Sequence, residues 1–390
     1  MLKYFNQIKF DRNELAGAFG DIGTDFPLIV GMILSAGLDS ASVLIMFGIM
    51  QILTGSIYRM PMPVQPLKAM ATIVIAQKTG ANILYGGGFA IGISMLILNV
   101  TKLIDWISKV VPKTVIRGIQ LGLGIKLGLL ALKNYVGAEG VNGYWLASLA
   151  FILVISLIGN RKYPPAIFII LLGIIYAFLF KIDGDSFMNA IGFNLPQFYT
   201  PTWNDILTGF IILTIPQIPL SIGNSILATK QIAEDLFPNR AITVRKISYT
   251  YSFMNLINPF FSGIPTCHGS GGMVGHFTFG GRTGGSVIIY GSLYILLGLF
   301  LSQGFDTLVN IFPLPVLGVI LLFESLGLMI LVRDITNSKA NFTIALLVGL
   351  IAGGLPYGFV IGLFVGTLLY YLKEKGITGF SNENKRSSLT

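Results

Sequence analysis

Prolines, a glutamine and a lysine stand together inside one of the most apolar stretches of the chain. The run MPMPVQPLKAMATIVIAQ places Gln65, Pro66 and Lys68 directly before a helix-forming segment. Proline has no backbone N–H and disfavours helix in the residue before it, so an extended stretch is predicted, with a helix starting near Pro66. The free N–H groups and partial positive charge of such a helix end suit an anion.

A second run, IPTCHGSGGMVG, has the same character. Pro265 and Thr266 are predicted to be extended, and a helix is predicted to start near His268 to Ser270, where glycines allow close approach. Two facing helix ends would make one anion site at the middle of a membrane. The alternative for Lys68 is a kinked helix whose lysine extends to the membrane surface.

Acidic side chains occur within apolar segments at three positions. FGDIGTDFPL carries Asp21 and Asp25 one helical turn apart, and Glu324 lies in a later segment. Bare carboxylates in lipid are costly, so these groups should face protein, a cation or water. The two aspartates either couple a proton or cation, or have a structural role. In the structural role they neutralise Lys68 or Lys126, or cap the helix after a break at Gly23. Glu324 fits a proton relay or a structural hydrogen bond equally well.

Two further polar groups have open interpretations. Gln217, in TIPQIPLSIGNSILATK, can donate to a ligand oxygen or hold two helices together. His268 is a donor near a helix start or a plain polar contact. Cys267 and His268 do not suggest an enzyme or a metal site, because the only other histidine is His276. No catalytic residue, metal or cofactor is predicted.

Composition sets the class of protein. Of 390 residues, 53% are hydrophobic and 11% are charged, which indicates an integral membrane protein in a lipid bilayer. The formal net charge is +9, but the basic residues are scattered singly, so no nucleic acid partner is expected. The polar first fourteen residues contain no signal peptide pattern.

Fourteen apolar segments are predicted, two of them short, and the fold class is all-α. With a cytoplasmic N-terminus, three lysines lie outside and two lie within spans, so 21 of the 26 basic residues lie at cytoplasmic ends. This asymmetry is what the positive-inside rule predicts. A protein of the cytoplasmic membrane with both termini inside is therefore expected. The segments are about 14–34, 40–57, 64–77, 82–104, 112–132, 144–160, 165–181, 206–230, 247–261, 268–278, 285–303, 312–332, 341–354 and 356–372.

The short segments are the third and the tenth, which indicates an internal repeat. Placing residue 60 beside residue 263 aligns the two proline-containing runs, and placing 111 beside 311 aligns two aliphatic–proline starts of long spans. Repeat one is then about 14–181 and repeat two about 206–372. Because each repeat has an odd number of spans, the second copy must be inverted relative to the first.

These motifs resemble the molybdate transporter family, a branch of the sulphate permease superfamily. The resemblance rests on ELAGAFGDIGTDFPLIVGM, MPMPVQPLKAMATIVIA and GIPTCHGSGGMVGHFTFGGRTGG and extends over essentially the whole chain. Sulphate permeases normally carry a soluble STAS domain after the last span, whereas the tail 373–390 is too short for a domain. Residues 1–372 are therefore expected to form one transmembrane unit.

The resemblance implies the inverted seven-plus-seven fold shared with uracil permease. A core domain (spans 1–4 and 8–11) would slide against a gate domain (spans 5–7 and 12–14), with substrate between the third and tenth segments. One departure is that no acid lies between Ile206 and Thr229, where related proton-coupled permeases carry one. The implied oxyanion contacts are Gln65, Pro66, Leu67, Lys68, His268, Gly269, Ser270 and Gly271, with Gln217 and Thr24 on the walls.

Import of a dianion needs a driving force. Moving two negative charges into a cell held ~100 mV negative costs about 4.6 kcal/mol. Protons are the expected coupling ion, and the candidate carriers are, in order, Asp21, Asp25, Glu324 and His268. Molybdate is the expected substrate, with sulphate or tungstate as close analogues. An anion channel is the alternative class, and the glycine-rich spans fit packing within one chain or in a homodimer.

Overall fold

The computed structural model describes residues 8–160, 162–163, 165–181, 191–304 and 313–377. Five helices are long and apolar enough to cross a membrane, and two bent helix pairs qualify if each is counted as one span. Three shorter apolar helices accompany them. The described chain is therefore that of a multi-pass membrane protein. Most of the predicted tail 373–390 lies outside the described residues.

The elements of the first half follow the predicted segments closely. In chain order they are α2 (Arg12–Ala18), α3 (Ile22–Ala36), α4 (Ser40–Tyr58), β1 (Val64–Pro66), α5 (Lys68–Gln77), α6 (Ala81–Val100), α7 (Leu103–Val110), α8 (Lys113–Leu130), η1 (Ala131–Tyr135), α9 (Gly140–Leu157) and α10 (Pro165–Phe180).

The second half also has a short strand directly before a short helix. Its elements are α12 (Trp203–Gly209), η2 (Phe210–Thr214), α13 (Ile215–Leu220), η3 (Ser221–Ala228), α14 (Thr229–Leu236), α15 (Val244–Ile257), η4 (Asn258–Phe261), β2 (Thr266–His268), α16 (Ser270–Thr278), α17 (Gly285–Phe300), η5 (Ser302–Gly304), α19 (Leu314–Ile330), η6 (Leu331–Ile335), α20 (Lys339–Gly354) and α21 (Gly358–Glu374).

The first and eighth predicted segments are both bent. α2 and α3 meet at 43°, and the helical stretches Trp203–Ile218 and Ser221–Leu236 meet at 52°. The break in the first segment falls between Ala18 and Ile22, so the expected break at Gly23 was wrong by a few residues. Asp21 occupies the N-cap position of α3 but makes no capping hydrogen bond, which leaves its carboxylate available for other contacts.

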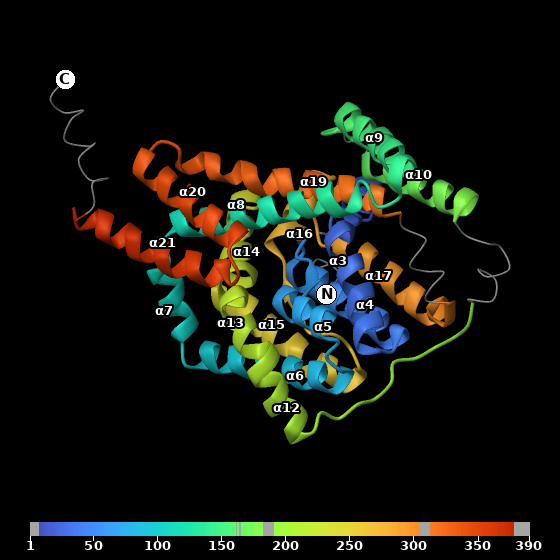
Figure 1. Cartoon of the computed structure of the whole chain (residues 1–390), viewed down its shortest axis with the longest axis horizontal. Coiled ribbons are helices and arrows are strands. Elements are labelled where there is room, and N and C mark those ends of the chain that lie inside the picture. Colours follow the sequence, from blue (N-terminus) through green and yellow to red (C-terminus); the bar gives the residue numbers. More distant parts are fainter. Residues whose placement is uncertain (1–7, 161, 164, 182–190, 305–312, 378–390) are drawn as a thin grey trace.

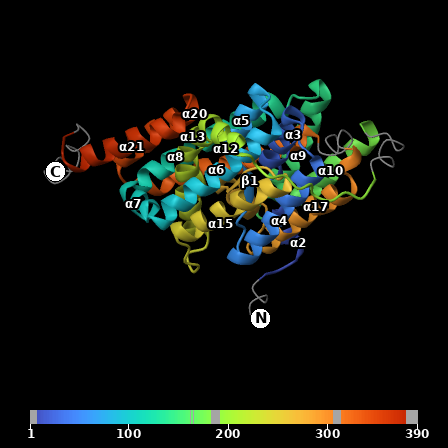
Figure 2. The same ribbon diagram turned by 90° about the horizontal axis from the view of Figure 1, so that it is seen from below.

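Two short strands meet near the centre of the molecule (Figure 2). β1 and β2 pair antiparallel, with Gln65 opposite Cys267. The extended residues form backbone hydrogen bonds with each other across the two strands. Without this pairing their N–H and C=O groups would lack partners within a membrane, which would be costly. The extended stretches predicted before the two half-helices thus pair as a small sheet in a mostly helical fold, and α5 begins at Lys68, two residues later than expected.

Side-chain amides complete the outer edges of the two strands in equivalent ways. Gln51 of α4 donates to the Val64 carbonyl at 2.8 Å and accepts from the Val64 N–H at 3.0 Å. Asn255 of α15 donates to the Thr266 carbonyl at 2.6 Å and accepts from the Thr266 N–H at 2.9 Å. Each strand is therefore held by one side chain from the helix that precedes it.

The helices fall into two packed groups (Figure 1). In one, α8 packs on α19 and α20, and α20 packs on α21. In the other, α4 packs on α17, and α6 packs on α12 and α15. The strands and the starts of α5 and α16 lie in the second group, and they face the first group through contacts such as those of α16 and α3 with α19.

Candidate functional site

Lys68 is the first residue of α5, close to the start that the proline pattern predicted. Its ammonium group is buried and has no hydrogen-bond partner among the described residues. A buried charge without a partner is costly unless a ligand or a nearby charge compensates it. The positive end of α5 lies at the same place, so this corner of the molecule offers both a full and a partial positive charge.

A cavity of about 400 Å³ lies against this helix end. Lys68 and Thr24 line it from α5 and α3, and Lys126 lines it from α8. Its lining contains no acidic residue and is otherwise mostly apolar. The remaining lining residues are Leu28, Ala69, Thr72, Ile73, Leu123, Leu127, Leu130, Pro216, Leu220, Tyr357, Gly358, Phe359 and Val360.

The start of α16 is closely packed by polar side chains of neighbouring segments. A Cβ atom on Gly269 would overlap the Gln65 side chain, one on Gly271 would overlap Glu324 Oε1, and one on Gly272 would overlap Asp21 Oδ2. The N–H groups of residues 270–272 donate to no described residue. Glycine is therefore required here by close approach, as the sequence pattern predicted.

Three carboxyl groups gather beside this helix end. Asp21, Asp25 and Glu324 are fully buried and interact electrostatically with one another and with Lys68. Gln65 donates to Asp21 Oδ1 at 2.6 Å, and Thr24 donates to Glu324 Oε2 at 3.0 Å. Asp25 accepts no hydrogen bond from a described residue. Thr24 thus joins the cavity wall to the carboxyl cluster.

Gln217 holds the start of α5. Its Oε1 atom accepts from the backbone N–H groups of Ala69 at 3.0 Å and Met70 at 3.2 Å, and its Nε2 atom donates to Ser221 at 3.1 Å. All its polar atoms are therefore engaged with protein, which matches the alternative of an interhelical contact rather than direct donation to a ligand.

His268 is not among the residues that line the cavity. Its Nε2 atom lies 2.7 Å from Thr250 Oγ1, its Nδ1 atom lies 3.4 Å from the Pro63 carbonyl, and its ring packs edge-on against Tyr58. The ring is fully buried among these partners. This arrangement matches the interpretation of His268 as a polar contact within the protein. Alternate side chains of a strand point to opposite faces, and the His268 ring lies on the face of these partners.

Comparison with known proteins assigns the family. Residues 13–127 and 209–328 match a family described as a molybdate transporter of the MFS superfamily. The chain belongs to the molybdate transporter family. Molybdate transporter 1 of Arabidopsis thaliana is 31% identical over 405 residues, covering 92% of this chain and 87% of that protein. Molybdate transporter 1 of Chlamydomonas reinhardtii is 25% identical and covers 90% of each chain.

Solved structures share the fold of this family member. The transmembrane domain of a cyanobacterium bicarbonate transporter, BicA, superimposes with a TM-score of 0.54 at 16% identity and covers 93% of this chain and 98% of that one. The murine anion transporter Slc26a9 in its inward-facing state gives 0.57 at 12% identity, with 95% and 70% covered. The predicted sulphate permease type of fold is confirmed, and the named relatives are transporters, as expected for a chain without an enzymatic role.

The structure brings only part of the predicted site of this molybdate transporter family member together at the cavity. Lys68 and Thr24 line it, whereas the other proposed contacts do not. These contacts lie in the two strands, at the starts of α5 and α16 or in α13, and they remain predictions: Gln65, Pro66, Leu67, His268, Gly269, Ser270, Gly271 and Gln217. Ser270 donates to Asn224 at 2.8 Å. Within the described residues, no group of three or more His, Cys, Asp or Glu is placed to hold a metal.

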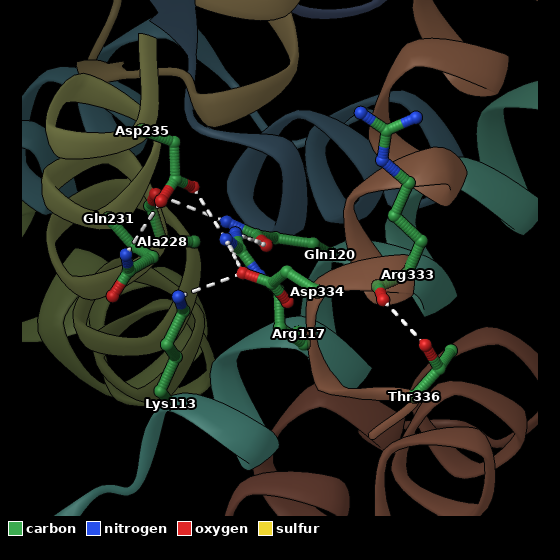
Figure 3. A network of polar contacts seen from close by, with 9 residues as sticks. All are labelled: Lys113, Arg117, Gln120, Ala228, Gln231, Asp235, Arg333, Asp334 and Thr336. Atoms are coloured by element: carbon green, nitrogen blue, oxygen red, sulfur yellow. Dashed lines mark hydrogen bonds and ion pairs between the residues drawn. The ribbon is translucent and has the colours of Figure 1, made fainter. Parts of the chain in front are cut away.

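An ion-pair network joins α8 to its neighbours, and no single motif in the sequence indicated it. Arg117 is 2% exposed and contacts both Asp334, at 2.6 Å, and Asp235, at 2.7 Å, through Nη2. It also donates to Gln120 at 2.8 Å. Figure 3 shows the guanidinium group between α14, which carries Asp235, and the segment that carries Asp334. Lys113 reaches Asp334 as well, at 2.8 Å.

Substituting Gly269 by alanine is expected to destabilise this family member by about 1–3 kcal/mol, because the new Cβ would displace Gln65 from Asp21. Thermal unfolding of the purified protein in detergent measures the effect. Gly354→Ala is the matched control, since a Cβ there meets no atom within 4 Å. Equal unfolding temperatures for the two variants would contradict the close packing at the start of α16.

Proposed function

We propose that this chain is a secondary active transporter that imports molybdate. The observation that carries the proposal is the ammonium group of Lys68, which has no hydrogen-bond partner among the described residues. It lies at the start of a helix, beside a cavity whose described lining contains no acidic residue. A tetrahedral dianion would supply the missing charge and hydrogen-bond acceptors. The named molybdate transporters to which the chain is similar support this choice of substrate.

Substrate would bind at the positive ends of α5 and α16. Lys68 donates a charge-assisted hydrogen bond, and the free N–H groups of residues 270–272 add donors when the dianion reaches them. Gln65 and Gln217 support this arrangement by holding Asp21 and the start of α5. The two half-helices would thus form one oxyanion site, of which the cavity beside Lys68 is the approach.

Protons are proposed as the coupling ion. Asp21, Asp25 and Glu324 lie close to Lys68 and to the start of α16, so their carboxylates would compete with a dianion for the same positive groups. Protonation removes that competition, and bound dianion in turn favours bound protons. Two or more protons carried with each dianion would offset the cost of about 4.6 kcal/mol against a potential of ~100 mV.

We also propose fourteen segments in two inverted repeats. Three pairs of equivalent features support this reading. The first and eighth segments are bent, Gln51 and Asn255 complete the two strands from the second and ninth segments, and a strand precedes a half-helix in the third and tenth. The antiparallel pairing of β1 and β2 is also what two copies related by inversion would give.

Transport would proceed by motion of a core domain against a gate domain, as the two packed helix groups suggest. In this proposal α8, α9, α10, α19, α20 and α21 form the gate. Arg117 ties α8 to α14 of the core through Asp235. Arg117 lies near the start of α8, and the cavity residue Lys126 lies near its end, about 14 Å further along the helix.

The two ends of α8 would then lie in opposite halves of the membrane. With both termini in the cytoplasm, the cavity lies in the outer half and the Arg117 network in the inner half. The network would keep the inner side closed while the cavity receives substrate from outside. Opening inward requires separation of Arg117 from Asp235, so this ion pair is proposed as the inner lock.

Asp235→Asn is expected to shift the population towards the inward-open state, because the core then loses its charged link to Arg117. A change of one to two kcal/mol would raise that population about 5- to 30-fold. Labelling of Ala228→Cys by maleimide, in a Cys267→Ser background, reports the opening. Glu234→Gln is the control, since Glu234 pairs with Lys230 on the same helix. Labelling at the wild-type rate in both variants would argue against a lock.

Calorimetry on purified protein tests the proposed function directly. Molybdate, tungstate and sulphate are titrated at fixed ionic strength, and uptake into proteoliposomes is then measured with and without a proton gradient. Tight molybdate binding with gradient-dependent, saturable uptake is expected. Stronger sulphate binding would assign a general oxyanion permease, uptake that fails to saturate would assign a channel, and lack of binding would contradict the site.

A further inference from the structure

The cavity has a second positive charge that the oxyanion site described above does not use. Lys126 lines it from α8, whereas Lys68 lines it from α5. These are the two charged residues in the lining of this cavity, and both are cations. A lysine within a membrane span is rare and usually faces a site or a pathway.

Phe359 holds the ammonium group of Lys126 in place. Nζ lies 4.8 Å from the centre of the phenyl ring, and Phe359 lines the same cavity. Lys126 makes no ion pair or hydrogen bond with another described residue. An aromatic face attracts the cation without neutralising its charge or accepting a conventional hydrogen bond, so the three N–H donors stay available.

We propose that Lys126 is a second anion contact of the transporter and determines its preference for doubly charged oxyanions. The inference rests on the proposed function. A dianion in the cavity would interact with one lysine from α5 and one from α8, so that its two charges are matched by two cations from different helices. A singly charged oxyanion of the same shape gains only half of each Coulomb term.

This contact also assigns a role to the proposed gate domain. The core contributes Lys68, while α8 of the gate contributes Lys126, so a dianion bound by both would link the two domains. A lysine that merely extends to the membrane surface would make no such link, and its removal would change the binding of either anion very little, because solvent screens the charge. Comparing a doubly charged with a singly charged ligand therefore distinguishes a direct anion contact of Lys126 from a lysine that extends to the membrane surface.

The test compares Lys126→Gln and Lys126→Arg with the wild type in calorimetric titrations of molybdate and of perrhenate, a tetrahedral oxyanion with a single charge. Lys126→Gln is expected to weaken molybdate binding about tenfold, as for loss of one charged contact. Perrhenate binding should weaken only about threefold, since the Coulomb term halves with ligand charge. Lys126→Arg should restore most of the difference.

Lys133→Gln serves as the matched control, because Lys133 is exposed and lies beyond the cavity lining. If Lys126→Gln cannot be purified, Lys126→Met, which keeps an aliphatic stem, replaces it. Equal losses for both anions, or no loss for either, would overturn the role of Lys126. Failure of the wild-type protein to bind molybdate would instead contradict the proposed function, so the two failures are distinguishable.

Discussion

Lys68→Ala should weaken molybdate binding about 10- to 100-fold, the largest effect that we expect from a single substitution at the site. The variant removes a charge-assisted contact of roughly 1.5–3 kcal/mol from the start of α5. It also leaves Asp21, Asp25 and Glu324 without the nearest compensating cation. Calorimetry on the purified variant measures the dissociation constant, and proteoliposome uptake should fall with it.

Lys78→Ala is the control for this prediction. Lys78 follows the other end of α5 and is exposed, so the variant makes the same change of net charge away from the cavity. An unchanged dissociation constant for Lys68→Ala would show that Lys68 does not contact the substrate. A similar loss in both variants would show that overall charge, rather than a specific contact, governs affinity, and added salt should then abolish the difference from wild type.

Asp25→Asn should preserve molybdate binding but remove most of the uptake that a proton gradient drives. Asp25 is fully buried and accepts no hydrogen bond from a described residue, so its carboxyl group is available to carry a proton. Asparagine has nearly the same shape but cannot bind and release that proton. Proteoliposome uptake at several imposed pH gradients gives the readout.

Proton uptake on binding provides a second measurement for Asp25. Titrations of molybdate in buffers with different ionisation enthalpies report how many protons the complex takes up, and the number should fall in Asp25→Asn. Asp105→Asn is the control, because Asp105 lies 3.7 Å from Arg245 at a partly exposed position remote from the cluster. An unaltered pH profile and proton count would move the coupling role to Asp21 or Glu324.

Local sequence chemistry determined where the chain breaks. Proline removes a backbone donor and restricts the residue before it, so the extended residues before α5 and α16 could be predicted from Pro66 and Pro265. Glycines predicted close approach at the start of α16, which the packing against Gln65 and Asp21 confirms. The same two motifs also carried the resemblance to the family to which the chain proved to belong.

The tertiary structure alone decided which groups meet. Gln217 could equally have faced a ligand, and only its position 3.0 Å from the Ala69 N–H shows that it holds α5. Arg117 lies 118 residues from Asp235 and 217 from Asp334, and nothing in its neighbours indicates either partner. The reason is physical: proline and glycine act on their own backbone and the adjacent residue, whereas a buried charge is satisfied by whichever distant segment the packing brings to it.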